Sequence, residues 1–306
     1  YKYFCMQKRL KSRIAPTPSG FLHLGNAFNF LLTALLVDSE KGHLHLRIDD
    51  FDNSRLNKKS VEDIFIQLEW LGIDYHSGPS GPDELFSIYS QKLKNDYYFS
   101  AIELLKKKKH IFACECSRSK IKLLSTKKYP GVCRFKGIDF KTKNIPWRMF
   151  VPEGVFIKYK TFFNSIKKIN IDEEMGDFVI KRRDGLPAYQ IVSLLEDLEE
   201  GINLIVRGQD LIASTGAQLF IAKYLNKNKF HDSKFVHHKL IKNNYGEKLS
   251  KSHGDLSLRV MKEKMKRPTF IYQEIAKILD LKFKEIITFD DLKHSFRISK
   301  NKKNLS

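Results

Sequence analysis

The stretch of sequence that decides the fold is RIAPTPSGFLHLGN, residues 13–26, which runs directly into an apolar helical pattern ending at Ser39. The residues at 13–15 predict a short strand, and the alternating HLHLRI of residues 43–48 predicts a second one. A strand, a loop, a helix and another strand in this order are typical of the first βαβ unit of a doubly wound sheet. We therefore predict an α/β fold whose sheet begins within residues 10–80.

The rest of the chain divides by composition. A helical pattern over 91–109 ends in four consecutive lysines, and residues 111–148 after it are basic and rich in turn residues, as expected of an insertion. Apolar strand patterns return at 178–180 and 202–206, and we assign both to the second half of the sheet. The expected organisation is a first half over 1–90, an inserted domain over 91–176, a second half over 177–255, and a C-terminal helical segment with a basic tail over 256–306.

The composition indicates a globular protein with a polyanionic partner. The chain has 306 residues, of which 55 are Lys or Arg and 35 are Asp or Glu, so its formal net charge is +20. A folded domain with this excess of positive charge is suited to bind nucleic acid. The longest apolar run near the start, residues 28–37, is too short and too polar to span a bilayer, and no export signal is visible. We expect a cytoplasmic protein with no membrane association.

The loop before the first helix has features of an anion-binding site. A helix N-terminus offers backbone N–H groups and a positive dipole end to a phosphate. Gly25 would let a base or a phosphate approach the backbone closely, and His23 can donate a hydrogen bond to phosphate oxygens in a transition state. Taken alone, a His-x-Gly sequence also occurs in ordinary loops, so this motif needs support from a second one.

A second motif lies late in the chain, where residues 246–254 read GEKLSKSHG. Lys248 and Lys251 are three residues apart, with Ser250 between them and a glycine at the end. A cationic loop of this kind can clamp a triphosphate and neutralise the charge that develops on it. For this segment alone, a solvated lysine turn is the alternative.

Together, in this order and about 225 residues apart, the two motifs resemble the HIGH and KMSKS motifs of class I aminoacyl-tRNA synthetases. Three further segments are similar to the glutamyl branch of that family: RIAPTPSG at 13–20, LRIDDFD at 46–52 and RGQDL at 207–211. The similarity covers residues 12 to about 255. It implies a Rossmann-type class I catalytic domain that activates L-glutamate with ATP and Mg²⁺ and transfers the glutamate to a tRNA.

The resemblance also implies which residues bind the two small substrates. Those implied for ATP are Pro16, His23, Gly25, Asn26, Lys248, Ser250 and Lys251, with His23, Lys248 and Lys251 as the catalytic residues. Those implied for glutamate are Arg13, Ile14, Ala15, Pro16, Thr17, Asp49, Tyr189 and Arg207.

Two of the implied positions depart from the usual pattern of the family. Asp49, which would face the ammonium group of glutamate, stands where bacterial glutamyl enzymes usually carry Glu and the glutaminyl sister group commonly has Asp. Asn26 replaces the final histidine of the HIGH pattern, as small polar residues do elsewhere in the glutamyl branch. Arg13 and Arg207 still favour a substrate with two carboxylates, because a planar guanidinium binds a carboxylate through two parallel hydrogen bonds.

Three cysteines and a tyrosine form a candidate metal site within the expected insertion. Cys114, Cys116 and Cys133 can supply thiolates and Tyr129 a phenol, and these four groups can close a tetrahedral shell around a structural Zn²⁺. From the residues alone, free buried cysteines are the alternative, and water or His110 could take the place of Tyr129. The spacing also matches the zinc site of the glutamyl-Q tRNA(Asp) synthetases, in the insertion that contacts tRNA.

The glutamyl-Q enzymes are truncated paralogues that attach glutamate to the queuosine base of tRNA(Asp). The chain resembles them in its Cys/Tyr arrangement, in the run FVIKRRDGLPAY at 178–189, and in the short segment after Ser252, in which we expect no anticodon-binding domain. Arg118 and Lys120 would present a phosphate-binding face. Two alternatives stay open: a glutamate–tRNA ligase that charges the tRNA 3′ end without its own anticodon domain, and a non-catalytic tRNA-binding paralogue. We favour a monomer, although the sequence does not determine the oligomeric state.

Overall fold

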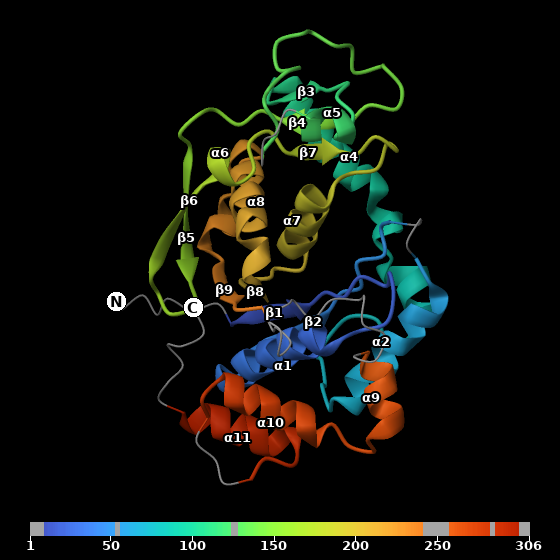
Figure 1. Cartoon of the computed structure of the whole chain (residues 1–306), viewed down its shortest axis with the longest axis vertical. Helices are drawn as coiled ribbons and strands as arrows, with labels where there is room; N and C mark the ends of the chain where they lie inside the picture. Colours follow the sequence, from blue (N-terminus) through green and yellow to red (C-terminus); the bar gives the residue numbers. More distant parts are fainter. Residues whose placement is uncertain (1–8, 53–55, 124–127, 241–256, 282–284, 300–306) are drawn as a thin grey trace, which may run out of the picture. The chain divides into compact units, whose positions relative to one another are not determined.

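The computed structural model describes residues 9–52, 56–123, 128–240, 257–281 and 285–299 (Figure 1). Two compact units make up the chain, and each is described by itself. The first unit consists of residues 1–93, 202–209 and 236–306, and the second consists of residues 94–201 and 210–235.

The first unit is built on a parallel sheet. β1 pairs in parallel with β2 on one side and with β8 on the other, and β9 follows β8 in the strand order. The elements of this unit are β1 (Lys11–Ile14), α1 (Leu24–Ser39), β2 (His43–Leu46), α2 (Lys58–Trp70), α3 (Pro82–Glu84), η2 (Leu85–Tyr89), β8 (Leu204–Gly208), α9 (Leu258–Lys264), α10 (Thr269–Ile278) and α11 (Phe289–Ile298). Three elements cross a unit boundary: η3 (Gln91–Lys94), η4 (Gln209–Leu211) and β9 (Lys234–His238).

Helix α1 is the central element of the first unit. Almost every side chain from Ala27 to Val37 is buried, which is typical of a helix covered on more than one side. α1 packs on β1, β2 and β8 with one side and on α10 and α11 with another (Figure 1). A bidentate ion pair between Arg297 of α11 and Asp38 of α1, at 2.6 and 2.7 Å, joins the two helices.

The second unit contains a helical pair and two groups of antiparallel strands. β3, β4 and β7 form a three-stranded antiparallel sheet, while β5 and β6 form a hairpin whose first strand lies beside β9. α8 packs against α7 and against the β5–β6 hairpin. The elements are α4 (Asn95–Lys107), β3 (Ile111–Ala113), α5 (Arg118–Leu123), β4 (Trp147–Met149), β5 (Phe156–Thr161), β6 (Ile166–Asn170), α6 (Ile171–Glu174), β7 (Val179–Lys181), α7 (Tyr189–Glu199), α8 (Ile212–Tyr224) and η5 (Asn228–Asp232).

The βαβ opening expected from residues 13–48 is confirmed as β1, α1 and β2. The expectation for the strand at 178–180 was wrong in its pairing, because β7 pairs antiparallel with β4 and does not join the parallel strands. A run of three apolar residues indicates a strand but carries no information about its partner. Helix α11 was not expected as a separate element, and the end of the expected basic tail, from Lys300 onward, lies outside the described residues.

Among the residues that the structure describes, none of the helices combines the length and the hydropathy needed to cross a bilayer.

Candidate functional site

Three buried arginines lie at the carboxyl ends of the parallel strands in the first unit. In the register of these strands Arg13 is aligned with His45 of β2, and Ser12 is aligned with Leu204 of β8. Because side chains alternate along a strand, Arg13, Arg47 and Arg207 project from the same face of the sheet. Their exposed fractions are 5%, 4% and 3%. Ligands of open α/β sheets bind at this edge, and three guanidinium groups there favour an anionic ligand.

Asp49 is the carboxylate at the same edge, and its side chain is held in place. Arg47 Nε donates to Asp49 Oδ1 at 2.7 Å, and Gln91 Nε2 donates to the same oxygen at 3.0 Å. The second oxygen, Oδ2, lies 3.4 Å from Arg47 Nη2 and is the less strongly bonded of the two. The Asp49 side chain retains 14% exposure, so this oxygen is suited to accept a hydrogen bond from a substrate.

The loops after β1 and β2 run side by side and extend the paired strands. Arg47 N donates to Ile14 O, and Asp49 N donates to Pro16 O, both at 2.9 Å. Ile14 and Pro16 are buried, whereas Ala15 is half-buried and Thr17 is exposed. Of these loop side chains, Ala15 and Thr17 are therefore the ones that a bound molecule can contact.

His23 is the N-cap of α1, and its imidazole is fixed by the helix that it caps. Gly25 N donates to His23 Nδ1 at 3.1 Å, so Nδ1 is an acceptor and the proton of the neutral ring resides on Nε2. Asn26 completes a capping box by accepting the His23 N–H at 3.0 Å. The half-buried His23 thus presents an N–H donor at a helix N-terminus with no acidic residue in its first turn.

Gly25 has a role that its sequence context did not indicate. A Cβ atom at this position would meet Cε1 and Nδ1 of His23 at 3.0 Å. The missing side chain therefore leaves room for the imidazole itself, whether or not it also admits a ligand.

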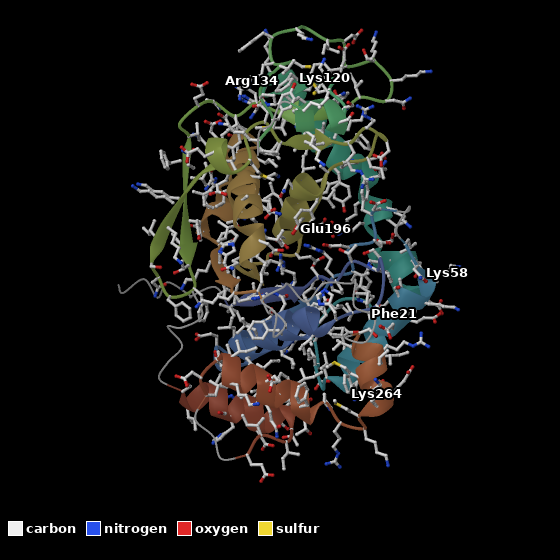
Figure 2. The ribbon with its side chains drawn as sticks, viewed as in Figure 1. Phe21, Lys58, Lys120, Arg134, Glu196 and Lys264 are labelled. Atoms are coloured by element: carbon white, nitrogen blue, oxygen red, sulfur yellow. The ribbon has the colours of Figure 1, made fainter. Side chains whose placement is uncertain are left out.

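The segment that enters α9 is attached directly to the residues around His23. Leu258 N donates to Leu22 O at 2.8 Å, and Ser257 forms a β-bridge with His23. Phe21 is labelled in Figure 2, and the guanidinium of Arg259 lies 5.0 Å from the centre of its ring. Three consecutive residues at the start of α9 thus contact three consecutive residues at the start of α1.

Asp63 of α2 lies near the contact between the start of α9 and the residues before α1. Its carboxylate accepts a hydrogen bond from Gln67 Nε2 at 3.0 Å. Burial raises the pKa of this carboxyl above its ordinary value, against the opposing effect of that hydrogen bond and of the positive charge of Arg259.

For four residues implied by the resemblance, the structure does not test a place in this arrangement. Lys248, Ser250 and Lys251 lie outside the described residues. Tyr189 is the first residue of α7 in the second unit, where it is 42% exposed, and its part in a glutamate site stays a prediction.

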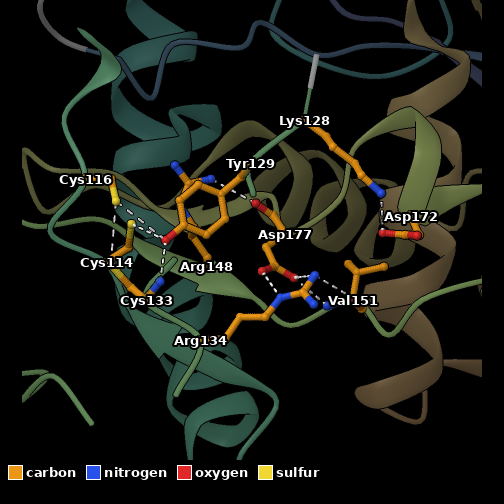
Figure 3. Close-up of polar contacts among 10 residues, drawn as sticks. All are labelled: Cys114, Cys116, Lys128, Tyr129, Cys133, Arg134, Arg148, Val151, Asp172 and Asp177. Carbon is orange, nitrogen blue, oxygen red and sulfur yellow. Dashed lines mark hydrogen bonds and ion pairs between the residues drawn. The ribbon is translucent and has the colours of Figure 1, made fainter. Parts of the chain in front are cut away.

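The cysteine cluster lies in the second unit, and the structure brings its four predicted members together (Figure 3). Cys116 Sγ is 3.6 Å from Cys133 Sγ, and Tyr129 Oη is 3.3 Å from Cys114 Sγ and 3.7 Å from Cys116 Sγ. A tetrahedral Zn²⁺ with Zn–S bonds of about 2.3 Å separates its sulfur ligands by about 3.8 Å. All four residues are at least 95% buried, so the cluster has the ligand types, spacing and enclosure of a structural metal site.

The surroundings of Tyr129 bear on whether its phenol can bind a metal. Burial raises the pKa of Tyr129 above its ordinary value, so deprotonation requires a cation nearby. The guanidinium of Arg148 lies 3.9 Å from the centre of the Tyr129 ring, and Cys133 N donates to Tyr129 Oη at 2.9 Å. Both contacts favour a negatively charged oxygen and are compatible with a phenolate ligand.

Asp177 connects the cluster to the strands of the second unit. This fully buried carboxylate receives two hydrogen bonds from Arg134, at 2.6 and 3.1 Å, and one from Val151 N (Figure 3). Its backbone oxygen accepts a hydrogen bond from Arg148, the residue that covers the Tyr129 ring.

The alternative ligand His110 is not in the cluster. The centre of its ring lies 4.0 Å from that of Tyr224, with the two ring planes tilted by 53°, and the described residues that can jointly hold a metal are the three cysteines. Lys120 is exposed on α5, as a phosphate-binding residue would be, whereas the side chain of Arg118 lies outside the described part.

Several residues of these sites were missed at the level of sequence. Arg47 had a usable signal, because residues two apart in an extended chain share a face and Arg47 is two residues before Asp49. Gln91 and Arg148 had none, since they are far along the chain from the groups that they contact.

Comparisons with known proteins identify the family of the chain. The model of the family "tRNA synthetases class I (E and Q), catalytic domain" matches residues 9–306. Glutamate–tRNA ligase 2 of Syntrophus aciditrophicus is 31% identical over 278 residues, which cover 86% of this chain and 56% of that protein. Glutamyl-Q tRNA(Asp) synthetase of Nitratidesulfovibrio vulgaris is 29% identical over 269 residues, which cover 83% and 81% of the two chains.

Solved structures support the same fold. The crystal structure of a glutamate–tRNA synthetase from Elizabethkingia anophelis superposes with a TM-score of 0.75 at 22% identity, over 94% of this chain and 65% of that one. The chain thus spans about 56% to 65% of the length of these full ligases. Because the model of the catalytic domain matches nearly the whole chain, the chain belongs to the glutamate and glutamine branch of the class I aminoacyl-tRNA synthetases.

Proposed function

We propose that this protein activates L-glutamate with ATP to form glutamyl-adenylate and then transfers the glutamate to a tRNA. The observation that carries the proposal is the attachment of Ser257, Leu258 and Arg259 to the residues around His23. Lys251 is six positions before Ser257 in the sequence. Six steps of an extended chain span about 20 Å, so the length of this connection permits Lys251 to reach the N-terminus of α1.

In the adenylation step, the α-carboxylate of glutamate attacks the α-phosphate of ATP in line, and the bond to pyrophosphate breaks. His23 Nε2–H and the dipole of α1 are suited to stabilise the negative charge that moves onto the leaving pyrophosphate. Lys248 and Lys251 would neutralise the same charge from their loop. Mg²⁺ that arrives with ATP would supply further neutralisation of the phosphate charge.

Recognition of glutamate would use the edge of the parallel strands. Arg13 and Arg207 can bind carboxylates, and the buried position of both makes each such contact strong. Asp49 Oδ2 can accept a hydrogen bond from the substrate ammonium while Arg47 and Gln91 hold Oδ1. Ala15 and Thr17 would add contacts from the loop after β1, and for Tyr189 the support is the resemblance to the family alone.

The experiment that tests the adenylation step is ATP–pyrophosphate exchange, with and without tRNA. Exchange that depends on glutamate, with glutamine at least tenfold less effective, is the expected result. Absence of exchange with either amino acid under both conditions would contradict the proposal and favour a non-catalytic tRNA-binding protein.

We also propose that Cys114, Cys116, Cys133 and Tyr129 hold a structural Zn²⁺. The contacts of 3.3–3.7 Å among their sulfur and oxygen atoms support this assignment. Metal analysis of the purified protein, expected to give one zinc per chain, tests it, and a chain that purifies folded and without metal would contradict it.

For the acceptor we propose the queuosine base of tRNA(Asp). The support is the similarity to the glutamyl-Q tRNA(Asp) synthetase of Nitratidesulfovibrio vulgaris, together with the enclosed Cys/Tyr cluster. Charging of the tRNA 3′ end is the second candidate, favoured by the similarity to a glutamate–tRNA ligase. Glutamate transfer to tRNA(Asp) that contains queuosine, and none to tRNA(Asp) without it, is expected, whereas charging of tRNA(Glu) at its 3′ end would support the second candidate.

A further inference from the structure

Asp49 and Asp50 are consecutive carboxylates in the loop after β2, and the structure gives them different surroundings. Asp50 is 1% exposed, and both of its oxygens are used: Oδ1 accepts the N–H of Gln91 at 2.8 Å, and Oδ2 accepts the hydroxyl of Ser90 at 2.6 Å. The Asp49 side chain retains 14% exposure. Asp50 therefore anchors the segment at 90–91, and Asp49 is the one of the two that a ligand can reach.

Gln91 connects the two carboxylates. Asp50 holds its backbone N–H, and its side-chain amide donates from Nε2 to Asp49 Oδ1 at 3.0 Å. The hydroxyl of Ser90 also accepts the N–H of Lys92, at 3.3 Å, and this contact fixes the backbone at the start of η3. Gln91 is itself 1% exposed, so the close-packed surroundings leave its side chain little freedom to move away from Asp49.

The contact between Arg47 and Asp49 is unequal. An arginine and a carboxylate frequently pair through two parallel hydrogen bonds, which occupy both carboxylate oxygens. Here Arg47 Nε lies 2.7 Å from Asp49 Oδ1, whereas Nη2 lies 3.4 Å from Oδ2. Oδ1 also receives the amide of Gln91, so two donors from different segments share one oxygen and the other oxygen is only weakly bonded.

We propose that Gln91 is a positioning residue, which turns the Asp49 carboxylate so that Arg47 does not close on both oxygens and Oδ2 stays available to the ammonium group of the amino acid. The proposal rests on the proposed function for the identity of the ligand. Without the amide, Arg47 and Asp49 would relax into the symmetric pair, and the guanidinium would occupy the oxygen that the substrate needs. Asp50 acts one step further away, since it holds the backbone of Gln91.

A neutral amide suits this task better than a second cation. Arg47 and Asp49 already form a pair with no net charge. A lysine or arginine in the place of Gln91 would make the surroundings of the substrate ammonium positive, and like charges repel most strongly where water is excluded. The glutamine side chain orients the carboxylate and adds no charge to the site.

The test removes the amide and follows the kinetics of each substrate separately. Gln91→Met keeps the length of the side chain and has no donor. We expect KM for glutamate in pyrophosphate exchange to rise about tenfold, with kcat and KM for ATP within twofold of the wild type, because the ammonium contact is the same in the ground state and the transition state. Gln91→Asn, whose amide is one methylene too short to reach Asp49 Oδ1, should give the same result and decides the matter if Gln91→Met does not fold.

Gln67 of α2 offers a matched control in the same unit. Its Nε2 donates to Asp63 Oδ1 at 3.0 Å, and it is 1% exposed like Gln91. Gln67→Met should lower the midpoint of thermal unfolding about as much as Gln91→Met does and leave KM for glutamate within twofold of the wild type. An unchanged KM for glutamate in the Gln91 variants, or an equal rise in Gln67→Met, would show that Gln91 has only a structural role.

A crystal structure of Gln91→Met tests the arrangement independently of the catalytic proposal. We expect the distance from Arg47 Nη2 to Asp49 Oδ2 to shorten from 3.4 Å to about 2.9 Å, which gives the symmetric pair. A pair that stays unequal would overturn the role of Gln91. A symmetric pair in the variant, together with a wild type that forms no glutamyl-adenylate, would overturn the proposed function and leave the positioning of Asp49 intact.

Discussion

The two candidate sites are held together in different ways. At the strand-end site of the first unit, backbone elements fix the side chains: the register of β1, β2 and β8 aligns three arginines, and the cap of α1 orients His23. In the cysteine cluster of the second unit, side chains hold loops together, because Cys114, Cys116, Tyr129 and Cys133 lie outside named strands and helices and contact each other.

This difference has consequences for what each site tolerates. A site built on strand ends keeps its framework when one ligand-binding side chain is removed, so activity is lost while the fold persists. In the cysteine cluster the side chains themselves hold the loops in place, so metal binding is coupled to local folding. A metal that binds only the folded form adds its binding free energy to the stability of that form. Four predictions test this contrast, from the largest expected effect to the smallest.

Removal of a strand-end guanidinium should abolish activity without unfolding the protein. Arg207→Ala leaves a buried carboxylate of the substrate without its partner, which costs about 3–5 kcal/mol. We expect kcat/KM for glutamate in pyrophosphate exchange to fall by about two to four orders of magnitude, with less than tenfold change in ATP binding. Arg9→Ala, which removes an exposed guanidinium of the same unit, serves as control and should retain activity. A near-normal kcat/KM for glutamate in Arg207→Ala would show that Arg207 does not bind the substrate.

Disruption of the cluster should give the opposite pattern. Cys133→Ser should lose the metal and reduce charging of tRNA by at least about tenfold, with glutamate-dependent pyrophosphate exchange measured under the same conditions changed less than twofold. Tyr129→Phe, which removes one oxygen and keeps the ring under Arg148, should bind the metal more weakly and still fold. Equal loss of adenylation and of tRNA charging in Cys133→Ser would mean that the two units do not act separately.

The capping box at the start of α1 should contribute to the free energy of unfolding. Asn26→Ala removes the acceptor for the His23 N–H and should lower the free energy of unfolding by about 1 kcal/mol. Asn26→Asp keeps the acceptor and should retain most of that stability. Denaturant unfolding of both variants measures the difference, and identical midpoints would show that the capping box contributes nothing.

The smallest effect concerns the pH dependence of stability at Asp63. Its pKa is raised in the folded state, so at pH values above the ordinary carboxyl value the folded protein holds a proton that the unfolded chain has lost. Stability therefore decreases as the pH rises through this interval, and the carboxyl is destabilising at neutral pH. Asp63→Asn should match the wild type near pH 3 and gain stability relative to it near pH 7, as measured by urea unfolding. A constant difference at both pH values would contradict the raised pKa.

The parts of the fold set by local pattern could be predicted from the sequence. Residues 13–48 gave the correct order of strand, helix and strand, because alternation and helical periodicity are local properties. The pairing of β7 with β4 could not be predicted, since it depends on contacts between residues about thirty positions apart. Helix α11 was missed although the sequence carried its signals: Phe289, Leu292 and Phe296 follow helical spacing, and Thr288 and Asp291 form a capping box at its start.

The candidate sites follow the same rule. The four members of the cysteine cluster were identified from spacing, and the structure brings them within contact of one another. Spacing could not predict the residues that hold the site side chains in place. In the cysteine cluster Arg148 covers the Tyr129 ring, and at the strand-end site Gln91 donates a hydrogen bond to Asp49. These partners come from distant parts of the chain, so they are known only once the fold is known.

The central claim is that His23 and Lys251 act on the same nucleotide. A crystal structure with a bound non-hydrolysable ATP analogue and glutamate tests it most directly. We predict that His23 Nε2 and Lys251 Nζ both lie within about 3 Å of phosphate oxygens of the one analogue, with Ser257 still bridged to His23. An analogue bound away from the N-terminus of α1, or contacted by one of the two groups while the other faces away, would contradict the account.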